Sequence, residues 1–164
     1  MSRQQITGHC MCGAVRYTVS GRPLPLSTVV CNCEDCQRAS GSAYAVVVPV
    51  RVSTLHLEGE PLAMYQTTGT DSAEHRARKF CPKCGSPILS ILAEAPEIAW
   101  LKAGTLDDKS SLAPAVEVWC ASAQEWTTRL PRRPHLRRGP PTLALRATRP
   151  LMRALDVVGR VGRH

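Results

Sequence analysis

The chain has 164 residues, of which 43% are hydrophobic and 21% charged, which is typical of one globular domain with an apolar core and excludes a chain disordered throughout. Its apolar runs, such as Ala45 to Val48, are far too short to span a bilayer. Residues 1–7 lack the basic start and apolar stretch of a secretory signal, so we expect a cytoplasmic protein. In a reducing compartment, eight cysteines need an explanation other than disulfides.

The net charge of +8 is unevenly distributed. Residues 1–128 hold 11 Lys and Arg against 12 Asp and Glu, whereas residues 129–164 hold ten Arg and one acidic residue, Asp156. All seven aromatic residues lie at or before Trp126. We therefore expect a nearly neutral domain over residues 6–128 and a basic Pro/Arg-rich tail over residues 129–164.

Short strand patterns separated by Gly and Pro run through the domain. Residues 15–19 alternate apolar and polar side chains, as in a half-buried strand. Only residues 34–40 resemble a short helical turn. Further strands are predicted at residues 43–50, 51–57, 64–68, 75–80, 87–92, 98–103 and 116–121. The pattern indicates an all-β or β-dominated fold.

The tail begins with a segment, residues 131–141, that holds four prolines and four arginines and favours an extended linker. Beyond it, Thr148 could cap a short amphipathic helix at residues 149–160, with arginines on one face. Such a segment could contact nucleic acid, an anionic membrane surface or an acidic partner. We favour a solvated, mostly disordered tail, because charge runs are usually solvated.

Seven of the eight cysteines fall into three clusters. They are Cys10-Met-Cys12-Gly, Cys31-Asn-Cys33-Glu-Asp-Cys36 and Cys81-Pro-Lys-Cys84-Gly. Close spacing lets one turn aim two sulfurs at one point, and a following glycine permits the tight turn. All-sulfur ligation favours zinc, although an iron–sulfur cluster would use the same residue types. Disulfides are disfavoured, because a Cys-x-Cys pair is poorly placed for disulfide geometry.

The spacing alone does not decide which clusters share a metal. Two pairs, Cys10 with Cys12 and Cys81 with Cys84, would complete one four-thiolate site. That leaves Cys31, Cys33 and Cys36 as a three-thiolate group, which is either a reactive zinc site with an open fourth position or a structural one closed by a remote side chain. The candidates for the remote ligand are His9, His56, His75 and Cys120. Cys120 itself is predicted to be a buried small apolar residue on the strand at 116–121.

With these residues in place, the domain resembles the glutathione-dependent formaldehyde-activating family, also called the CENP-V/GFA family. The matching segments are Gly8-His-Cys10-Met-Cys12-Gly-Ala-Val-Arg-Tyr17, Cys31-Asn-Cys33-Glu-Asp-Cys36-Gln-Arg-Ala-Ser-Gly41, Phe80-Cys81-Pro-Lys-Cys84-Gly-Ser-Pro87, residues 103–108 and the region from Val118 to Trp126. The resemblance covers about residues 6–128. It departs from the family at Asn32, often His there, and at Gln37-Arg38, usually a basic pair; both changes could alter substrate contacts.

The resemblance implies a zinc-stapled, mainly β fold similar to Mss4-like proteins, with two zinc ions per chain. It places Cys10, Cys12, Cys81 and Cys84 on a structural zinc, and Cys31, Cys33 and Cys36 on a catalytic zinc with an open fourth position. The implied activity is that of a carbon–sulfur lyase, which joins formaldehyde and glutathione into S-hydroxymethylglutathione or reverses that step. The expected partner is a small glutathione-like thiol.

Two other functions compete with this one. The runner-up is a non-catalytic zinc-stabilised binding module whose tail recruits nucleic acid or an acidic partner. The nearly neutral domain argues against nucleic-acid binding outside the tail, since such domains normally carry a basic face. A sulfoxide reductase is disfavoured, because Cys120 is the only spare cysteine and has no resolving partner.

Overall fold

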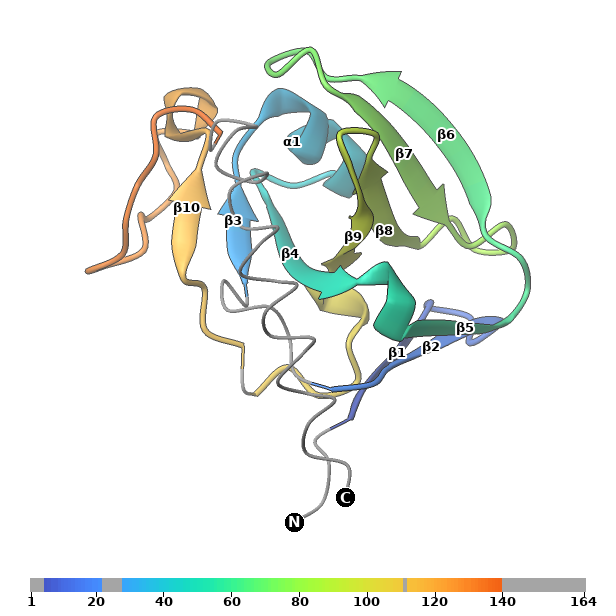
Figure 1. Cartoon of the computed structure of the whole chain (residues 1–164). Helices are drawn as coiled ribbons and strands as arrows, with labels where there is room; N and C mark the ends of the chain where they lie inside the picture. Colours follow the sequence, from blue (N-terminus) through green and yellow to red (C-terminus); the bar gives the residue numbers. More distant parts are fainter. Residues whose placement is uncertain (1–4, 22–27, 111, 140–164) are drawn as a thin grey trace, which may run out of the picture.

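Two β-sheets form the framework of the described part of the protein. The structure is a computed structural model that describes residues 5–21, 28–110 and 112–139. The smaller sheet has the strand order β1 (Ile6–His9), β2 (Val15–Val19) and β5 (Leu55–Gly59). The larger sheet has the order β10 (Val116–Val118), β3 (Val29–Cys31), β4 (Ala45–Arg51), β9 (Ala95–Lys102), β8 (Pro87–Leu92), β7 (His75–Phe80) and β6 (Ala63–Thr68). The predicted β-dominated fold is confirmed (Figure 1).

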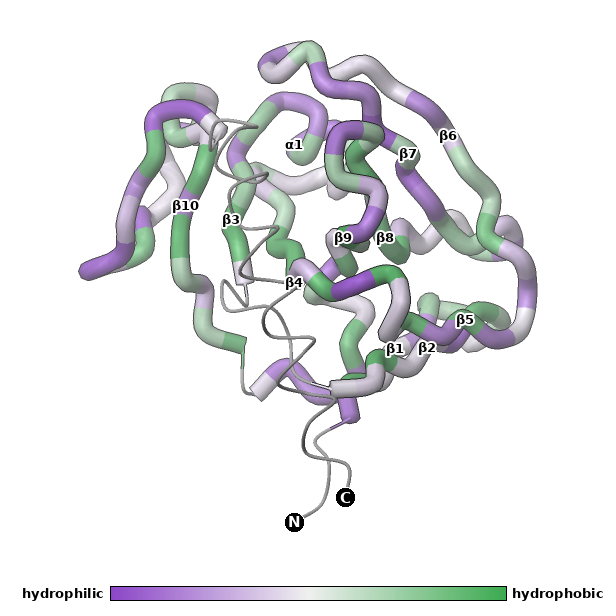
Figure 2. Tube along the Cα trace, in the orientation of Figure 1, coloured by the Kyte–Doolittle hydropathy of each residue, from purple (hydrophilic) through white to green (hydrophobic). Residues whose placement is uncertain are grey.

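The main core combines apolar side chains from both sheets. On β2, Val15, Tyr17 and Val19 are buried, while Arg16 is exposed, as the alternation predicts. They pack with a group contributed by the larger sheet: Val48, Val50, Ile88, Leu89, Ala99 and Leu101. Strands β3, β4 and β8 are mainly hydrophobic, whereas β7 and its loop to β6 are mainly hydrophilic (Figure 2). Burial of these side chains supplies the main driving force for folding.

The single α-helix in the described part of the chain, α1 (Glu34–Ser40), connects β3 to β4. Acidic Glu34 and Asp35 in its first turn and Arg38 in its last turn match the helix dipole. Its end is capped at Gly41, whose amide donates to the Gln37 carbonyl. The helix lies above the ends of β3 and β4 (Figure 1). The position of the helix matters because Cys33 is its N-cap residue and Cys36 lies in its first half.

Several predicted strands have other bounds in the structure. The predicted strand at residues 51–57 is wrong in its first half: Val52–Thr54 form a 3-10 turn before β5. Strand β4 runs through Pro49, as the predicted strand at 43–50 does, and extends to Arg51. Pro49 is tolerated because β3 pairs with β4 only as far as Val47. The predicted strand at 116–121 ends at Val118, because Trp119 takes a left-handed backbone conformation with φ of 58°. Strands β1 and β3 were not predicted.

Part of the predicted tail is hydrogen-bonded to the domain. The amides of Cys120 and Ala121 donate to the carbonyls of Leu136 and Arg137, and Glu117 exchanges backbone bonds with Pro134 and Leu136. This part of the linker is nevertheless exposed. The boundary at residue 128 stays a prediction, and the helix predicted at 149–160 lies outside the described residues. No helix among the described residues has the length and apolar character needed to cross a membrane.

Candidate functional site

The first cysteine group joins two turns that are far apart in the sequence. Cys10 and Cys12 lie in the turn after β1, and Cys81 and Cys84 lie in the turn after β7. The four Sγ atoms lie within 4.8 Å of one another, with 3.5 Å between those of Cys10 and Cys12 and 3.9 Å between those of Cys12 and Cys81. Cys10 and Cys81 are buried, whereas Cys12 is exposed. The structure thus brings together the two pairs that the sequence suggested for one metal.

Each turn of this group is closed by a glycine that follows its second cysteine. The amide of Gly13 donates to the carbonyl of Cys10 at 3.0 Å, and that of Gly85 donates to Cys81 at 2.9 Å. Both glycines have positive φ, 75° and 73°, where a side chain would be strained. The Met11 amide donates to the hydroxyl of Ser86 at 3.1 Å, which links the two turns. The position of each cysteine pair is therefore fixed by a hydrogen bond within its own turn and by the hydrogen bond from Met11 to Ser86 between the turns.

The second group comprises Cys31 at the end of β3, Cys33 at the helix N-cap and Cys36 in the first half of α1. Their Sγ atoms lie within 4.8 Å, with 3.4 Å between Cys31 and Cys33. All three are buried, at 8%, 6% and 2% exposure, in a second apolar cluster with Val47 and Val118. A buried cluster of thiols without disulfides needs a compensating cation if the thiols are to ionise.

None of the four proposed remote ligands joins the three cysteines in the described part of the chain. His9 pairs with Asp107 at 3.2 Å, and His75 lies 3.2 Å from the Thr68 hydroxyl. The Sγ of Cys120 donates to the carbonyl of Glu117 at 3.6 Å. Cys120 is half-buried on a 3-10 turn, not buried on a strand as predicted. Among the described residues, the second group therefore offers three donors.

The electrostatics of both groups fit a bound cation. In the second group, hydrogen bonds from Cys31 and Cys33, and then the positive charges of Lys102 and Arg76, hold the pKa of Cys36 well below its usual range. The same hydrogen bonding with Cys33 and Cys36 raises the pKa of Cys31 well above its usual range. In the first group, hydrogen bonds with Ser86 lower the pKa of Cys84 to about 5. Adjacent thiols cannot all ionise without a cation, and seven soft sulfur donors suit zinc.

Asn32 and Gln37, two positions at which the sequence departs from the family pattern, make hydrogen bonds within the protein. Asn32 is fully buried, and its Nδ2 donates to Glu117 Oε1 at 3.0 Å and to the Val118 carbonyl at 3.1 Å. Gln37 Nε2 donates to the carbonyls of Asn32 and Ser122 at 2.6 Å and 2.8 Å. Both side chains therefore fix the backbone that presents the cysteines. Glu117 was not identified from the sequence, because an acidic residue between two valines indicates an exposed position.

Three cations near the second group were also missed. Lys102 ends β9 and is 9% exposed, while Arg76 and Arg78 lie on β7. Their register positions bring them beside the group: Lys102 pairs with Val47 of β4, and the Arg78 guanidinium lies 3.9 Å from Asp35 on α1. No local sequence signal marks them, since single basic residues in strands are usually solvated.

A family model, a curated protein and a solved structure are similar to this chain. The family model "Glutathione-dependent formaldehyde-activating enzyme" matches residues 5–122, which include both cysteine groups. A curated Halomonas elongata protein named "Putative glutathione-dependent formaldehyde-activating enzyme" is 31% identical over 105 residues, which span 62% of this chain and 66% of the relative. A crystal structure of a Rhodobacter sphaeroides protein shares 27% identity with a TM-score of 0.49, covering 66% of this chain and 91% of that one. The chain belongs to the glutathione-dependent formaldehyde-activating enzyme family.

Proposed function

We propose that this protein is a zinc-dependent carbon–sulfur lyase that joins formaldehyde and glutathione into S-hydroxymethylglutathione or reverses that step. Membership of the family supports the substrate pair. The observation that carries the proposal is the contrast between the two cysteine groups, since one offers four sulfur donors and the other offers three buried donors. Four thiolates close a tetrahedral zinc site, whereas three leave a position for an external ligand.

Each group has a separate role in this proposal. Cys10, Cys12, Cys81 and Cys84 would hold a structural zinc that joins the turns after β1 and β7. Cys31, Cys33 and Cys36 would hold a catalytic zinc, so that two ions bind per chain. A bound zinc would supply Lewis acidity and lower the pKa of a coordinated thiol. The expected site of action, the cytoplasm, stays a prediction.

The reaction itself needs little covalent chemistry. The substrate sulfur lone pair attacks the formaldehyde carbon, a C–S bond forms, the C=O π pair moves to oxygen, and that oxygen takes up the proton that the thiol loses. The protein's contribution is to bind and orient the two reactants, which makes their encounter effectively unimolecular. Lys102 and Arg76 place positive charge beside the three thiols and thereby offset the negative charge of a fully ionised group.

A glutathione titration of the cobalt-substituted protein tests the open position. Cobalt replaces zinc and its sulfur-to-metal charge-transfer bands report the number of thiolate ligands. We expect a saturable band change with glutathione that is absent in Cys33→Ser, which retains one metal per chain, and present in the control Cys120→Ser. An unchanged spectrum with two metals bound would mean a closed second site and would favour the zinc-stabilised binding module.

A further inference from the structure

A cavity of about 210 Å³ is lined by residues that neighbour both cysteine groups in the sequence. Ala39 of α1 lines one side, three residues after Cys36 and therefore on the same face of the helix. Gly85 lines the other side and directly follows Cys84. The remaining lining residues come from β6, β7, β8 and β9: Tyr65, Arg78, Lys79, Phe80, Pro87, Leu89 and Lys102. A ligand in this cavity would therefore lie beside the helix that carries Cys36.

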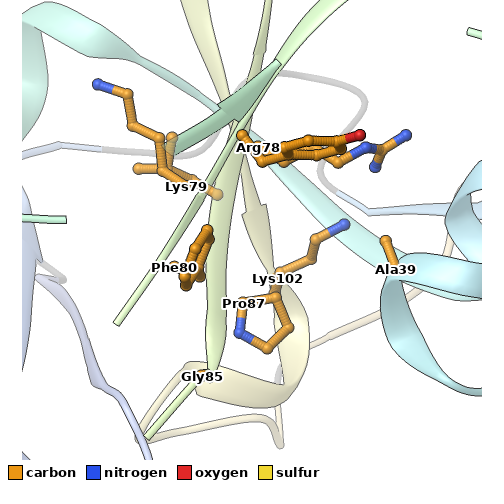
Figure 3. Close-up of a pocket in the computed structure, with 9 residues that line it drawn as sticks. Ala39, Arg78, Lys79, Phe80, Gly85, Pro87 and Lys102 are labelled. Carbon is orange, nitrogen blue, oxygen red and sulfur yellow. The ribbon is translucent and has the colours of Figure 1, made fainter. Parts of the chain in front are cut away.

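Two positively charged side chains, Lys102 and Arg78, line this cavity, and neither forms a close hydrogen-bonded pair with a carboxylate of the described residues. Figure 3 shows the Lys102 ammonium and the Arg78 guanidinium directed toward the side of Ala39, while the Lys79 ammonium points away. Lys102 is 9% exposed, and within residues 5–21, 28–110 and 112–139 no carboxylate pairs with its Nζ. Burial is the first cause of its lowered pKa. Burying an ammonium without a carboxylate partner is costly, so a site for an anionic ligand is a physical reason for its position.

The Arg78 guanidinium has N–H groups that make no hydrogen bond among the described residues. Its Nη1 is buried and has no hydrogen-bond partner among the described residues. Its Nη2 lies 3.9 Å from Asp35 Oδ2, beyond hydrogen-bond distance, and its Nε donates to the Thr67 hydroxyl at 3.3 Å. Asp35 already accepts bonds from the amide and hydroxyl of Thr70 at 3.0 Å and 2.9 Å. The outer edge of the guanidinium is therefore available to a planar anion such as a carboxylate.

We propose that Arg78 and Lys102 form a carboxylate-binding subsite that holds the thiol substrate while its sulfur reaches Cys31, Cys33 and Cys36. The inference rests on the proposed function and assigns the residues of this chain that would bind a carboxylate of the thiol substrate and favour it over a neutral thiol. Lys102 and Ala39 line the same cavity, Ala39 follows Cys36 by three residues on α1, and Lys102 pairs with Val47, which packs with the three cysteines, so one substrate can engage the cation and the cysteine group together. The two residues position the substrate and discriminate between substrates; they take no part in bond formation.

Binding measurements on the zinc-loaded full chain test this subsite. Isothermal titration calorimetry would give the dissociation constants of glutathione and of its diethyl ester, which keeps the thiol but has neutral carboxyl groups. We expect wild type to bind glutathione at least about tenfold more tightly than the diester, because hydrogen bonds to charged groups are the stronger ones. In Arg78→Met, glutathione should bind about tenfold more weakly and the diester should bind unchanged. In Lys102→Met, which also removes a positive charge from beside the cysteine group, glutathione should be weakened about tenfold more than the diester.

The control is Lys79→Met, which removes a cation from the same cavity wall but one directed away from the cavity. It should keep the preference for glutathione over the diester. Equal affinity of wild type for the two ligands would overturn the subsite, even if the Arg78 and Lys102 variants failed to fold. Equal weakening of both ligands in the variants would also overturn it, since the cations would then act only on the cysteine group. A wild-type protein that bound neither ligand would refute the proposed function, and the subsite with it.

Discussion

Replacing Cys12 with serine tests whether a metal in the first cysteine group joins the two sheets. Cys12 is exposed, so serine at this position leaves no cavity and mainly removes a ligand. The Sγ atoms of Cys12 and Cys81 are 3.9 Å apart across 69 residues of sequence. For a cross-link that closes a loop of this length, the loop-closure relation predicts that the folded state is stabilised by about 4 kcal/mol, because the cross-link reduces the conformational entropy of the unfolded chain.

The assay is urea unfolding followed by tryptophan fluorescence, with the zinc content of each protein measured in parallel. A loss of about 4 kcal/mol corresponds to a fall of about 2 M in the midpoint for an m-value of about 2 kcal/mol/M. The control Met11→Ser changes the adjacent residue, which is 84% exposed, and should leave both the midpoint and the zinc content unchanged. A Cys12→Ser protein that lost one zinc equivalent and still unfolded at the wild-type midpoint would refute the cross-link.

Two further predictions concern buried polar groups. Burial raises the pKa of Tyr17 to about 12, and its hydroxyl donates to Thr105 at 2.8 Å, so the folded protein binds the phenolic proton more tightly than the unfolded chain. The free energy of unfolding should therefore be flat below pH 10 and fall by about 2 to 3 kcal/mol between pH 10 and 12, a fall that Tyr17→Phe should remove in pH-dependent urea titrations. If Tyr17→Phe shows the wild-type slope, another group is responsible. Asn32→Ala should cost about 3 kcal/mol, because the buried Glu117 carboxylate loses its 3.0 Å bond from the amide. Thermal and urea unfolding would measure this loss, with exposed Gln66→Ala as the control, and equal stability of the two variants would contradict it.

Local patterns predicted much of the secondary structure. The strands at 75–80 and 87–92 and the helix at 34–40 have the predicted bounds, because alternation and turn residues act over neighbouring positions. The errors occurred where distant contacts decide the conformation. Glu117 is buried on β10 because Asn32 supplies its partner, and no alternation pattern contains that information. Similarly, β3 has only three residues and exists because it pairs with both β4 and β10.

The spacing of the cysteines by itself determined which residues could act as ligands, since the sulfurs within each cluster are held by one local turn. It also separated the pairs from the group of three. The assembly of Cys10 and Cys12 with Cys81 and Cys84 depends on strands that bring the two turns together. Only the tertiary structure placed Lys102 and Arg78 beside the helix of Cys36, because strand register and burial decide which charges meet across a sheet and have no signature in the neighbouring residues.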